Sequence, residues 1–367
     1  MIHFVTTPEE VFTIRDYLSI RGTALAPRFR IVEYERLAEW THLERGTYVL
    51  SALDQLSPGM LRLVETLVEQ FEQSDGVRFV NHPSRTMQRF KLLQTLSRLG
   101  RNDFRAERVT RDHQALRFPV FLRSERDHGG PVSPLLHSSR DVDTAIVRAL
   151  ARGFRLDELL VVEFCDTADA SGIVRKYGAF IVGDRVIPKN VAVSRDWMVK
   201  RQGTEDGPEF IEENVAYVLS NPHQQALTEI FQLAGVGYGR IDYAVKGGRI
   251  QTWEINLTPT IGQGIGRSSG HLPEASQRRR AVARDHFYLA FQDAWEGIDS
   301  IPDGPRIPIT LDDRLRREAL ARTEQRGLIG RVRATLGPLD RIVKPLGVRA
   351  MPLLAAIAKR ASRLTSE

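Results

Sequence analysis

The sequence contains a single cysteine, Cys165, among 367 residues. One cysteine excludes a disulfide within the chain and fits a reducing compartment. No apolar run approaches the roughly 18 residues that cross a bilayer, and the first residues lack the basic, apolar and small-residue succession of a signal peptide. We therefore expect a cytoplasmic protein without membrane-spanning segments.

The remaining composition is that of an ordinary globular protein, with 42% hydrophobic and 27% charged residues. Its length suits two or three domains. The net charge of +6 is unevenly placed, because residues 314–367 hold 13 Lys and Arg against 4 Asp and Glu, which leaves residues 1–313 with −3. Since the basicity is terminal and no helix-turn-helix or base-stacking module is recognisable, we expect no nucleic-acid partner.

The basic tail, residues 301–367, is predicted to be helical with breaks at glycine and proline. Its end combines apolar and basic side chains in an amphipathic profile: Leu353, Leu354, Ile357 and Leu364 with Arg349, Lys359, Arg360 and Arg363. Three interpretations stay open. The tail contacts anionic lipid, which would make the protein peripheral to the membrane; it docks a protein partner; or it packs on its own domain.

Residues 1–80 read as a small α/β unit. Strands are predicted at 2–5, 29–34, 47–51 and 77–80, and helices at 8–20 and 58–71. Strands that alternate with helices imply a parallel sheet. No glycine-rich phosphate loop follows the first strand, so we assign this unit no cofactor.

The middle of the chain alternates strands, helices and hairpins. A strand at 118–123 leads into Gly129-Gly130, whose turn can present backbone N–H groups to phosphate oxygens. His128 is read as a loop residue, because no second histidine or cysteine lies at metal-ligand spacing. A helix at 139–154, a buried strand at 159–165 and a hairpin at 172–189, turning at Gly183-Asp184, follow.

A second hairpin, residues 240–256, carries three oxygen-bearing side chains: Asp242, Glu254 and Asn256. A two-residue Gly-Gly loop would pair Asp242 with Trp253 and separate the carboxylates. A three-residue loop ending at Arg249 would instead place Asp242 opposite Glu254, about 5 Å away. Like charges in that arrangement repel unless a cation compensates them, and hard oxygen ligands suit Mg²⁺. We therefore expect the longer loop and a magnesium site.

The pattern Arg240-Ile241-Asp242, eleven residues, then Glu254-Ile255-Asn256 resembles the metal-binding end of the ATP-grasp family, with a likeness that spans roughly residues 80–265. The resemblance implies a fold class of α/β and α+β parts. Residues 1–80 would form the α/β domain that precedes an ATP-grasp domain, and residues 81–300 two α+β lobes, about 81–160 and 161–300, followed by the helical basic tail.

The resemblance also implies roles for individual residues. Lysine is usual where Arg123 stands, so that phosphate contact departs from the family pattern. The residues expected to bind the phosphates are Lys91, Arg123, Gly129, Gly130, Arg175, Lys176 and Lys189. Glu163 and Phe164 would contact adenine, and Asp166 or Asp169 would contact the ribose. Arg195 and Arg240 would contact the reacting phosphoryl group, and the metal would be bound by Asp242, Glu254 and Asn256.

The implied activity is an ATP- and Mg²⁺-dependent ligase, with Mn²⁺ as an alternative ion. It would join a small-molecule or peptide carboxylate to an amine through an acyl phosphate. A kinase of the same architecture and a non-catalytic nucleotide-binding scaffold remain alternatives. The sequence specifies neither the substrates, which fold analogy does not fix, nor the oligomeric state.

Overall fold

The computed structural model describes residues 1–110, 115–126, 129–199, 204–205, 207–262, 272–300 and 304–321. The chain forms two compact units, and it passes three times between them. The first unit comprises Met1–Asp103 and Cys165–Asp312, and the second comprises Phe104–Phe164 and the chain from Asp313 onward. The three-domain division expected from the sequence stays a prediction.

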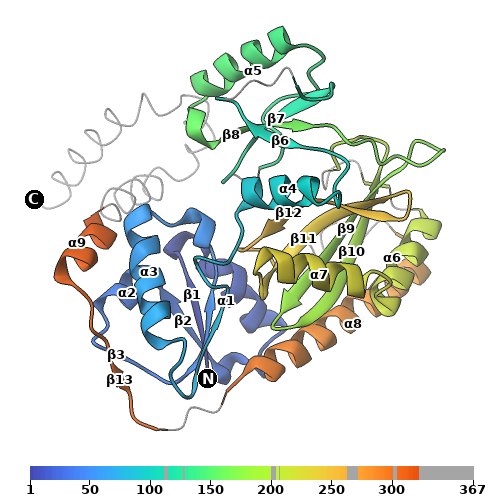
Figure 1. The fold of residues 1–367 in the computed structure, drawn as a ribbon. Coiled ribbons are helices and arrows are strands. Elements are labelled where there is room, and N and C mark those ends of the chain that lie inside the picture. Colours follow the sequence, from blue (N-terminus) through green and yellow to red (C-terminus); the bar gives the residue numbers. More distant parts are fainter. Residues whose placement is uncertain are drawn as a thin grey trace, which may run out of the picture. The chain divides into compact units, whose positions relative to one another are not determined.

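The N-terminal part of the first unit is built on a parallel sheet in the order β2-β1-β4-β5. This confirms the parallel sheet expected from the alternation of strands and helices (Figure 1). Ser57 caps the longest helix of this part by accepting a hydrogen bond from the Met60 N–H, and Pro58 follows at the first helical position. The elements are β1 (Ile2–Thr6), α1 (Val11–Ile20), β2 (Phe29–Glu33), α2 (Tyr34–Glu39), β4 (Gly46–Leu50), α3 (Pro58–Phe71) and β5 (Val77–Val80).

The second sheet of this unit is antiparallel, in the order β10-β9-β11-β12. Aromatic side chains of this sheet and of the long helix α8 pack with the first strand, so that both sheets share one hydrophobic core, in which Phe4, Phe180, Tyr238, Phe291 and Trp295 are fully buried. The elements, labelled in Figure 1, are α4 (Arg89–Arg98), β9 (Val174–Val182), β10 (Arg185–Ser194), α6 (Pro208–Ser220), α7 (Gln224–Ala234), β11 (Tyr238–Lys246), β12 (Arg249–Asn256) and α8 (Glu274–Ile298).

The second unit holds a small antiparallel sheet in the order β6-β8-β7. Its core joins α5 to that sheet through buried valines and leucines. The elements are β6 (Ala106–Arg108), β7 (Val120–Ser124), α5 (Ser139–Ala151), β8 (Leu159–Glu163) and α9 (Asp313–Ala321); in the first unit a short bridge joins β3 (His42–Leu43) to β13 (Ile307–Pro308). The chain thus combines α/β and α+β architecture, as expected.

The register of the β11–β12 hairpin corrects one prediction and confirms another. The predicted three-residue loop is wrong: Lys246 pairs with Arg249, so the loop is the two-residue Gly247-Gly248 turn. Both glycines have positive φ, 53° and 76°, as a type I′ turn requires. Asp242 nevertheless pairs with Glu254, because the register shifts between Asp242 and Tyr243 and leaves an extra residue on β12. A β-bulge, absent from the sequence reasoning, therefore brings the carboxylates together.

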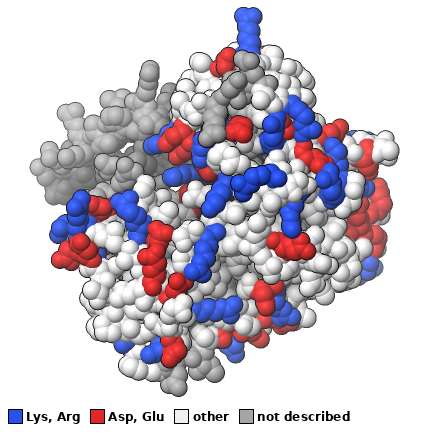
Figure 2. Space-filling model, viewed as in Figure 1, with Lys and Arg blue, Asp and Glu red and all other residues white. Residues whose placement is uncertain are grey.

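In the part of the chain that the structure describes, no helix combines the length and the apolar character needed to span a bilayer. On the face drawn in Figure 2, lysines and arginines are interspersed with acidic residues. Most of the basic tail, including the amphipathic stretch at 349–364, lies outside the described residues, so its three interpretations stay predictions.

Candidate functional site

Asp242 lies at the centre of a charged cluster on the polar face of the antiparallel sheet. The Arg240 guanidinium binds both of its carboxylate oxygens, with Nε 2.8 Å from Oδ1 and Nη2 3.2 Å from Oδ2. The Lys176 ammonium approaches Oδ2 at 3.3 Å from the neighbouring strand β9. The Asp242 side chain is only 6% exposed, and its charge raises the pKa of the Arg240 guanidinium. Of the predicted site residues, the structure thus brings Lys176, Arg240 and Asp242 together.

Glu254, opposite Asp242, has a partner that the sequence reasoning missed. Arg89, the first residue of α4, forms an ion pair with Glu254 Oε2, and the two side chains are 4% and 15% exposed. The signal was present in the sequence: Arg89 shares i, i+3, i+4, i+7 spacing with Leu92, Leu93 and Leu96, and a cation on an apolar stripe requires a buried partner. Lys91, the residue predicted from this helix, is exposed.

Asn256 completes the predicted trio and pairs with Arg240 across the hairpin. Its amide oxygen accepts a hydrogen bond from the Thr258 N–H at 2.8 Å. The backbone that follows is held from the N-terminal part of the unit, because the Ser51 hydroxyl donates to the Leu257 carbonyl at 2.8 Å. The amide oxygen is therefore oriented by the turn that follows β12.

The compensating charges at this site are supplied by the chain itself. The cation expected beside the facing carboxylates is present as Arg240, Lys176 and Arg89, which form ion pairs with them, and the magnesium site stays a prediction. Within the described ranges, no group of three His, Cys, Asp or Glu side chains could hold a metal ion. Two carboxylates and an amide oxygen on one hairpin nevertheless fit Mg²⁺, which needs few protein ligands when phosphates and water complete its shell.

Lys189, which was predicted to contact phosphate, lies beside this cluster among backbone carbonyls and aromatic rings. Its ammonium donates to the Ile261 carbonyl at 2.6 Å and approaches the Thr260 carbonyl at 3.4 Å. It also lies 5.0 and 5.1 Å from the centres of the Phe180 and Phe287 rings. Burial, reinforced by the Arg240 charge and opposed by Asp242, lowers the pKa of Lys189 to about 7. A cation in such surroundings is costly, which calls for a structural or chemical reason.

The other predicted cations of the β9–β10 region point elsewhere. Arg175 binds Glu213 at 2.7 Å and Asp169 at 2.5 Å, because successive side chains of a strand face opposite sides. That contact lowers the pKa of the Asp169 carboxyl, which also accepts the backbone N–H groups of two residues in its own turn. Arg195 is largely exposed and contacts Ser171 and Glu205. None of these contacts involves Asp242 or Glu254.

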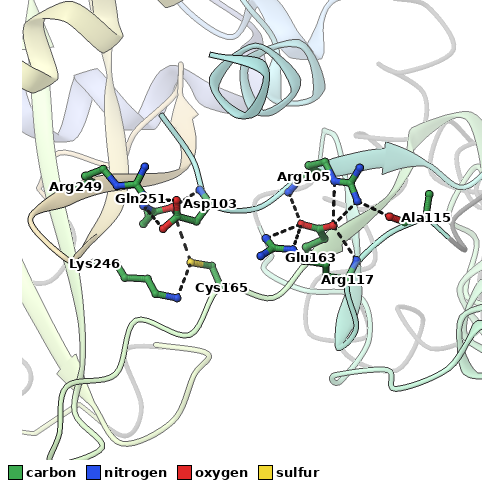
Figure 3. Close-up of polar contacts among 9 residues, drawn as sticks. All are labelled: Asp103, Arg105, Ala115, Arg117, Glu163, Cys165, Lys246, Arg249 and Gln251. Carbon is green, nitrogen blue, oxygen red and sulfur yellow. Dashed lines mark hydrogen bonds and ion pairs between the residues drawn. The ribbon is translucent and has the colours of Figure 1, made fainter. Parts of the chain in front are cut away.

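In the second unit, Glu163 is buried by arginines (Figure 3). Its carboxylate accepts backbone N–H groups and guanidinium groups from both Arg105 and Arg117. Burial alone would raise the pKa of the Glu163 carboxyl, but these donors bring it below its usual range. The Glu163 side chain therefore has a structural partner set, and its predicted contact with adenine stays a prediction.

The other predicted nucleotide contacts of the second unit lie on β7 and at the strand ends. Arg123 is half-buried on β7, and the Phe164 N–H donates to the Pro119 carbonyl. Gly130 has a φ of 100°, which favours glycine, and it follows Gly129 in the predicted phosphate turn. Their roles stay predictions, and His128 lies outside the described residues.

In the first unit, Gln251 contacts Asp103 and Cys165, which lie at two of the three points where the chain passes between the units (Figure 3). Its Oε1 accepts the Asp103 N–H at 2.8 Å and lies 3.9 Å from the Cys165 sulfur. The Lys246 ammonium is 4.0 Å from the same sulfur. A pocket elsewhere in this unit, lined by Arg30, Arg36 and Trp40 among others, contains none of the predicted site residues.

The structure thus defines a mixed α/β protein whose antiparallel sheet carries two facing carboxylates surrounded by cations. No protein-family model and no curated protein matches the sequence.

Solved structures similar to it include D-alanine–D-alanine ligase from Bacillus anthracis complexed with ATP, at 13% identity, covering 81% of this chain and 99% of that one, with a TM-score of 0.42. L-amino acid ligase from Bacillus licheniformis is similar at 10% identity, 80% and 73% coverage and a TM-score of 0.39. The ATP-grasp ligase PsnB, complexed with a minimal precursor, is similar at 13% identity, 70% and 90% coverage and a TM-score of 0.43. At these identities and TM-scores the similarities assign neither a family nor a function to this chain.

Proposed function

We propose that the protein is an ATP- and Mg²⁺-dependent ligase of ATP-grasp type that joins a carboxylate to an amine. The observation that carries the proposal is the pairing of Asp242 with Glu254 within a cluster of cations. Arg89, Lys176 and Arg240 contribute three positive charges against two carboxylates. The cluster therefore has an excess of +1, which suits a polyphosphate accompanied by a divalent ion.

Asp242, Glu254 and Asn256 would hold the magnesium ion through oxygen atoms. Mg²⁺ so bound neutralises charge that develops on phosphate oxygens during transfer. The remaining contribution of the protein is orientation. Lys176 and Arg240 bind the Asp242 carboxylate in this structure. The phosphate oxygens of ATP would offer both side chains an alternative anionic partner at the same place. The rigid guanidinium fork of Arg240 suits such oxygens.

The proposed reaction has two steps. A carboxylate oxygen of the first substrate attacks the γ-phosphorus of ATP, the bond to the β,γ-bridging oxygen breaks, and ADP leaves. The amine nitrogen of the second substrate then attacks the carbonyl carbon of the acyl phosphate. The bond from carbon to the phosphate oxygen breaks, inorganic phosphate departs, and the nitrogen loses a proton. Arg240 would stabilise the charge on the transferred group, with positioning supplying most of the remaining rate gain.

The experiment is a measurement of ADP release with a panel of carboxylates and amines. The proposal expects release that requires Mg²⁺ and a carboxylate, with an amide product when an amine is added. Accumulation of acyl phosphate or of a phosphorylated hydroxyl would identify a kinase instead. Nucleotide binding without turnover across the whole panel would favour a scaffold.

Two variants and one control sharpen this experiment. Asp242→Asn and Glu254→Gln should each lower ADP release by at least about 100-fold, because a ligand to the metal is lost. The control is Glu229→Gln, since Glu229 forms an ion pair with Arg101 but is 47% exposed. Activity that survives both hairpin substitutions would contradict the assignment of this site.

A further inference from the structure

Lys189 is a cation whose neighbours are carbonyl oxygens and aromatic rings. Its ammonium donates to the Ile261 carbonyl at 2.6 Å, and the rings of Phe180 and Phe287 lie about 5 Å away. Within the described residues, no ion pair connects Lys189 to a carboxylate. Burial of an ammonium carries a free-energy cost, and the hydrogen bonds to the Ile261 and Thr260 carbonyls offset part of it.

The position of Lys189 in its strand explains how its side chain reaches these partners. The register of β10 against β9 shifts between Pro188 and Asn190, so Lys189 is the extra residue of a bulge. A bulge redirects a side chain from the regular alternation of a strand. Lys189 consequently joins three parts of the first unit: β10, α8 through Phe287, and the segment 257–262.

The segment 257–262 follows directly from Asn256. Its backbone is fixed mostly from outside, because the Ser51 hydroxyl binds the Leu257 carbonyl and the Lys189 ammonium binds those of Ile261 and Thr260. The Tyr288 hydroxyl of α8 also approaches the Ile261 carbonyl, at 3.5 Å. Since the Thr258 N–H orients the Asn256 amide oxygen, the placement of this segment determines where that oxygen points.

We propose that Lys189 is a positioning residue, which fixes the backbone of Thr260 and Ile261 and thereby orients the Asn256 amide oxygen toward the hairpin carboxylates. For its effect on metal binding, this inference rests on the proposed function. It assigns Lys189 a role different from the phosphate contact expected from the resemblance. A turn of the ammonium toward phosphate would break the hydrogen bond to Ile261 and leave that carbonyl without its charged donor.

Among the described residues, two charged groups act on Lys189. Arg240 and Asp242 on β11 act on it electrostatically, β9 contributes Phe180, and α8 contributes Phe287 together with Tyr288 at the shared carbonyl. The two β11 charges oppose one another in their effect on Lys189. The carbonyls of the segment are therefore its main polar partners.

The test compares Lys189→Met, which keeps the length of the side chain and removes the charge and donors, with the wild type. Hydrogen exchange of peptides covering 257–262 reports on the segment, while titrations of ATP without metal and of Mn²⁺ with a non-hydrolysable ATP analogue report on the site. We expect at least tenfold faster exchange in 257–262, about tenfold weaker Mn²⁺ binding, and metal-free ATP affinity within about twofold of the wild type.

Lys189→Arg should restore part of both effects, because it retains a charged donor near the carbonyls. The matched control is Lys246→Met, an exposed lysine of the same sheet whose contact is with Cys165, and it should leave exchange in 257–262 unchanged.

Two results would overturn the proposal. Unchanged exchange in 257–262 would show that the ammonium does not hold the segment. A large loss of metal-free ATP affinity with normal exchange would identify Lys189 as a phosphate contact. If the wild type binds neither nucleotide nor Mn²⁺, the proposed function fails, and the exchange result still decides whether Lys189 fixes the segment.

Discussion

Replacing Arg89 by methionine probes the ion pair that joins α4 to the hairpin. The side chains of Arg89 and Glu254 are 4% and 15% exposed, so the substitution leaves a carboxylate largely out of water beside Asp242. Loss of one partner of a buried ion pair typically costs about 3–5 kcal/mol. The double variant Arg89→Met with Glu254→Gln removes both charges and should recover about half of that loss, a coupling of about 2 kcal/mol.

Urea unfolding, followed by tryptophan fluorescence, measures this effect. Trp253 adjoins Glu254 on β12 and gives a local signal. With a urea dependence of roughly 2 kcal/mol per molar, the midpoint should fall by about 1.5–2.5 M in Arg89→Met. The control is Arg101→Met, whose pair with Glu229 at 3.0 Å is exposed on both sides, and its cost should stay below about 1 kcal/mol. Equal costs for the two variants would refute the claim that the Arg89–Glu254 pair is buried and coupled.

Three further predictions follow from individual residues. Folding lowers the pKa of Lys189 from 10.5 to about 7, so the unfolded state binds more protons than the folded state between these pH values. The free energy of unfolding should therefore rise as pH increases from about 7 to 10.5, by at most about 5 kcal/mol. Urea titrations at several pH values should show this slope in the wild type and not in Lys189→Met. The lowered pKa of Glu163 means that its stabilisation is present above its ordinary pKa of 4.5 and is lost as pH falls through the folded-state value; Glu163→Gln should cost about 2–3 kcal/mol at pH 7 and remove that acid-dependent loss. Gly235 and Gly100 have nearly the same φ, 65° and 66°, but an added Cβ would lie 2.5 Å from the Arg85 carbonyl oxygen at Gly235 and in open space at Gly100. Gly100→Ala should therefore lose only the backbone strain of about 1–2 kcal/mol. Thermal melts should show a clearly larger loss of stability for Gly235→Ala.

The sequence was sufficient for elements with strong local signals. The helix at 58–71 combines a capping serine, a proline at its start and a regular apolar stripe, and the structure has α3 at those residues. The turn at Gly183-Asp184 was likewise readable, since β9 ends at Val182 and β10 begins at Arg185. The very short strands β3, β6 and β13 were missed, because two or three residues carry no periodicity.

The candidate site was only partly readable. The pairing of Asp242 with Glu254 was predicted correctly through a wrong loop length, because a bulge cannot be seen from alternation alone. The buried partner of Glu254 comes from α4, 165 residues away in the sequence. Lys189 was predicted to contact phosphate, and nothing in a regular strand pattern shows that a bulge turns it toward the Ile261 carbonyl.

The most direct test of the central claim is a titration of Mn²⁺ observed by electron paramagnetic resonance, with a non-hydrolysable ATP analogue present. Binding by the hairpin oxygens predicts a protein-bound Mn²⁺ signal that requires the nucleotide, is lost in Asp242→Asn and Glu254→Gln, and persists in Glu229→Gln. A bound signal of undiminished affinity in both hairpin variants would contradict the claim that Asp242 and Glu254 hold the metal.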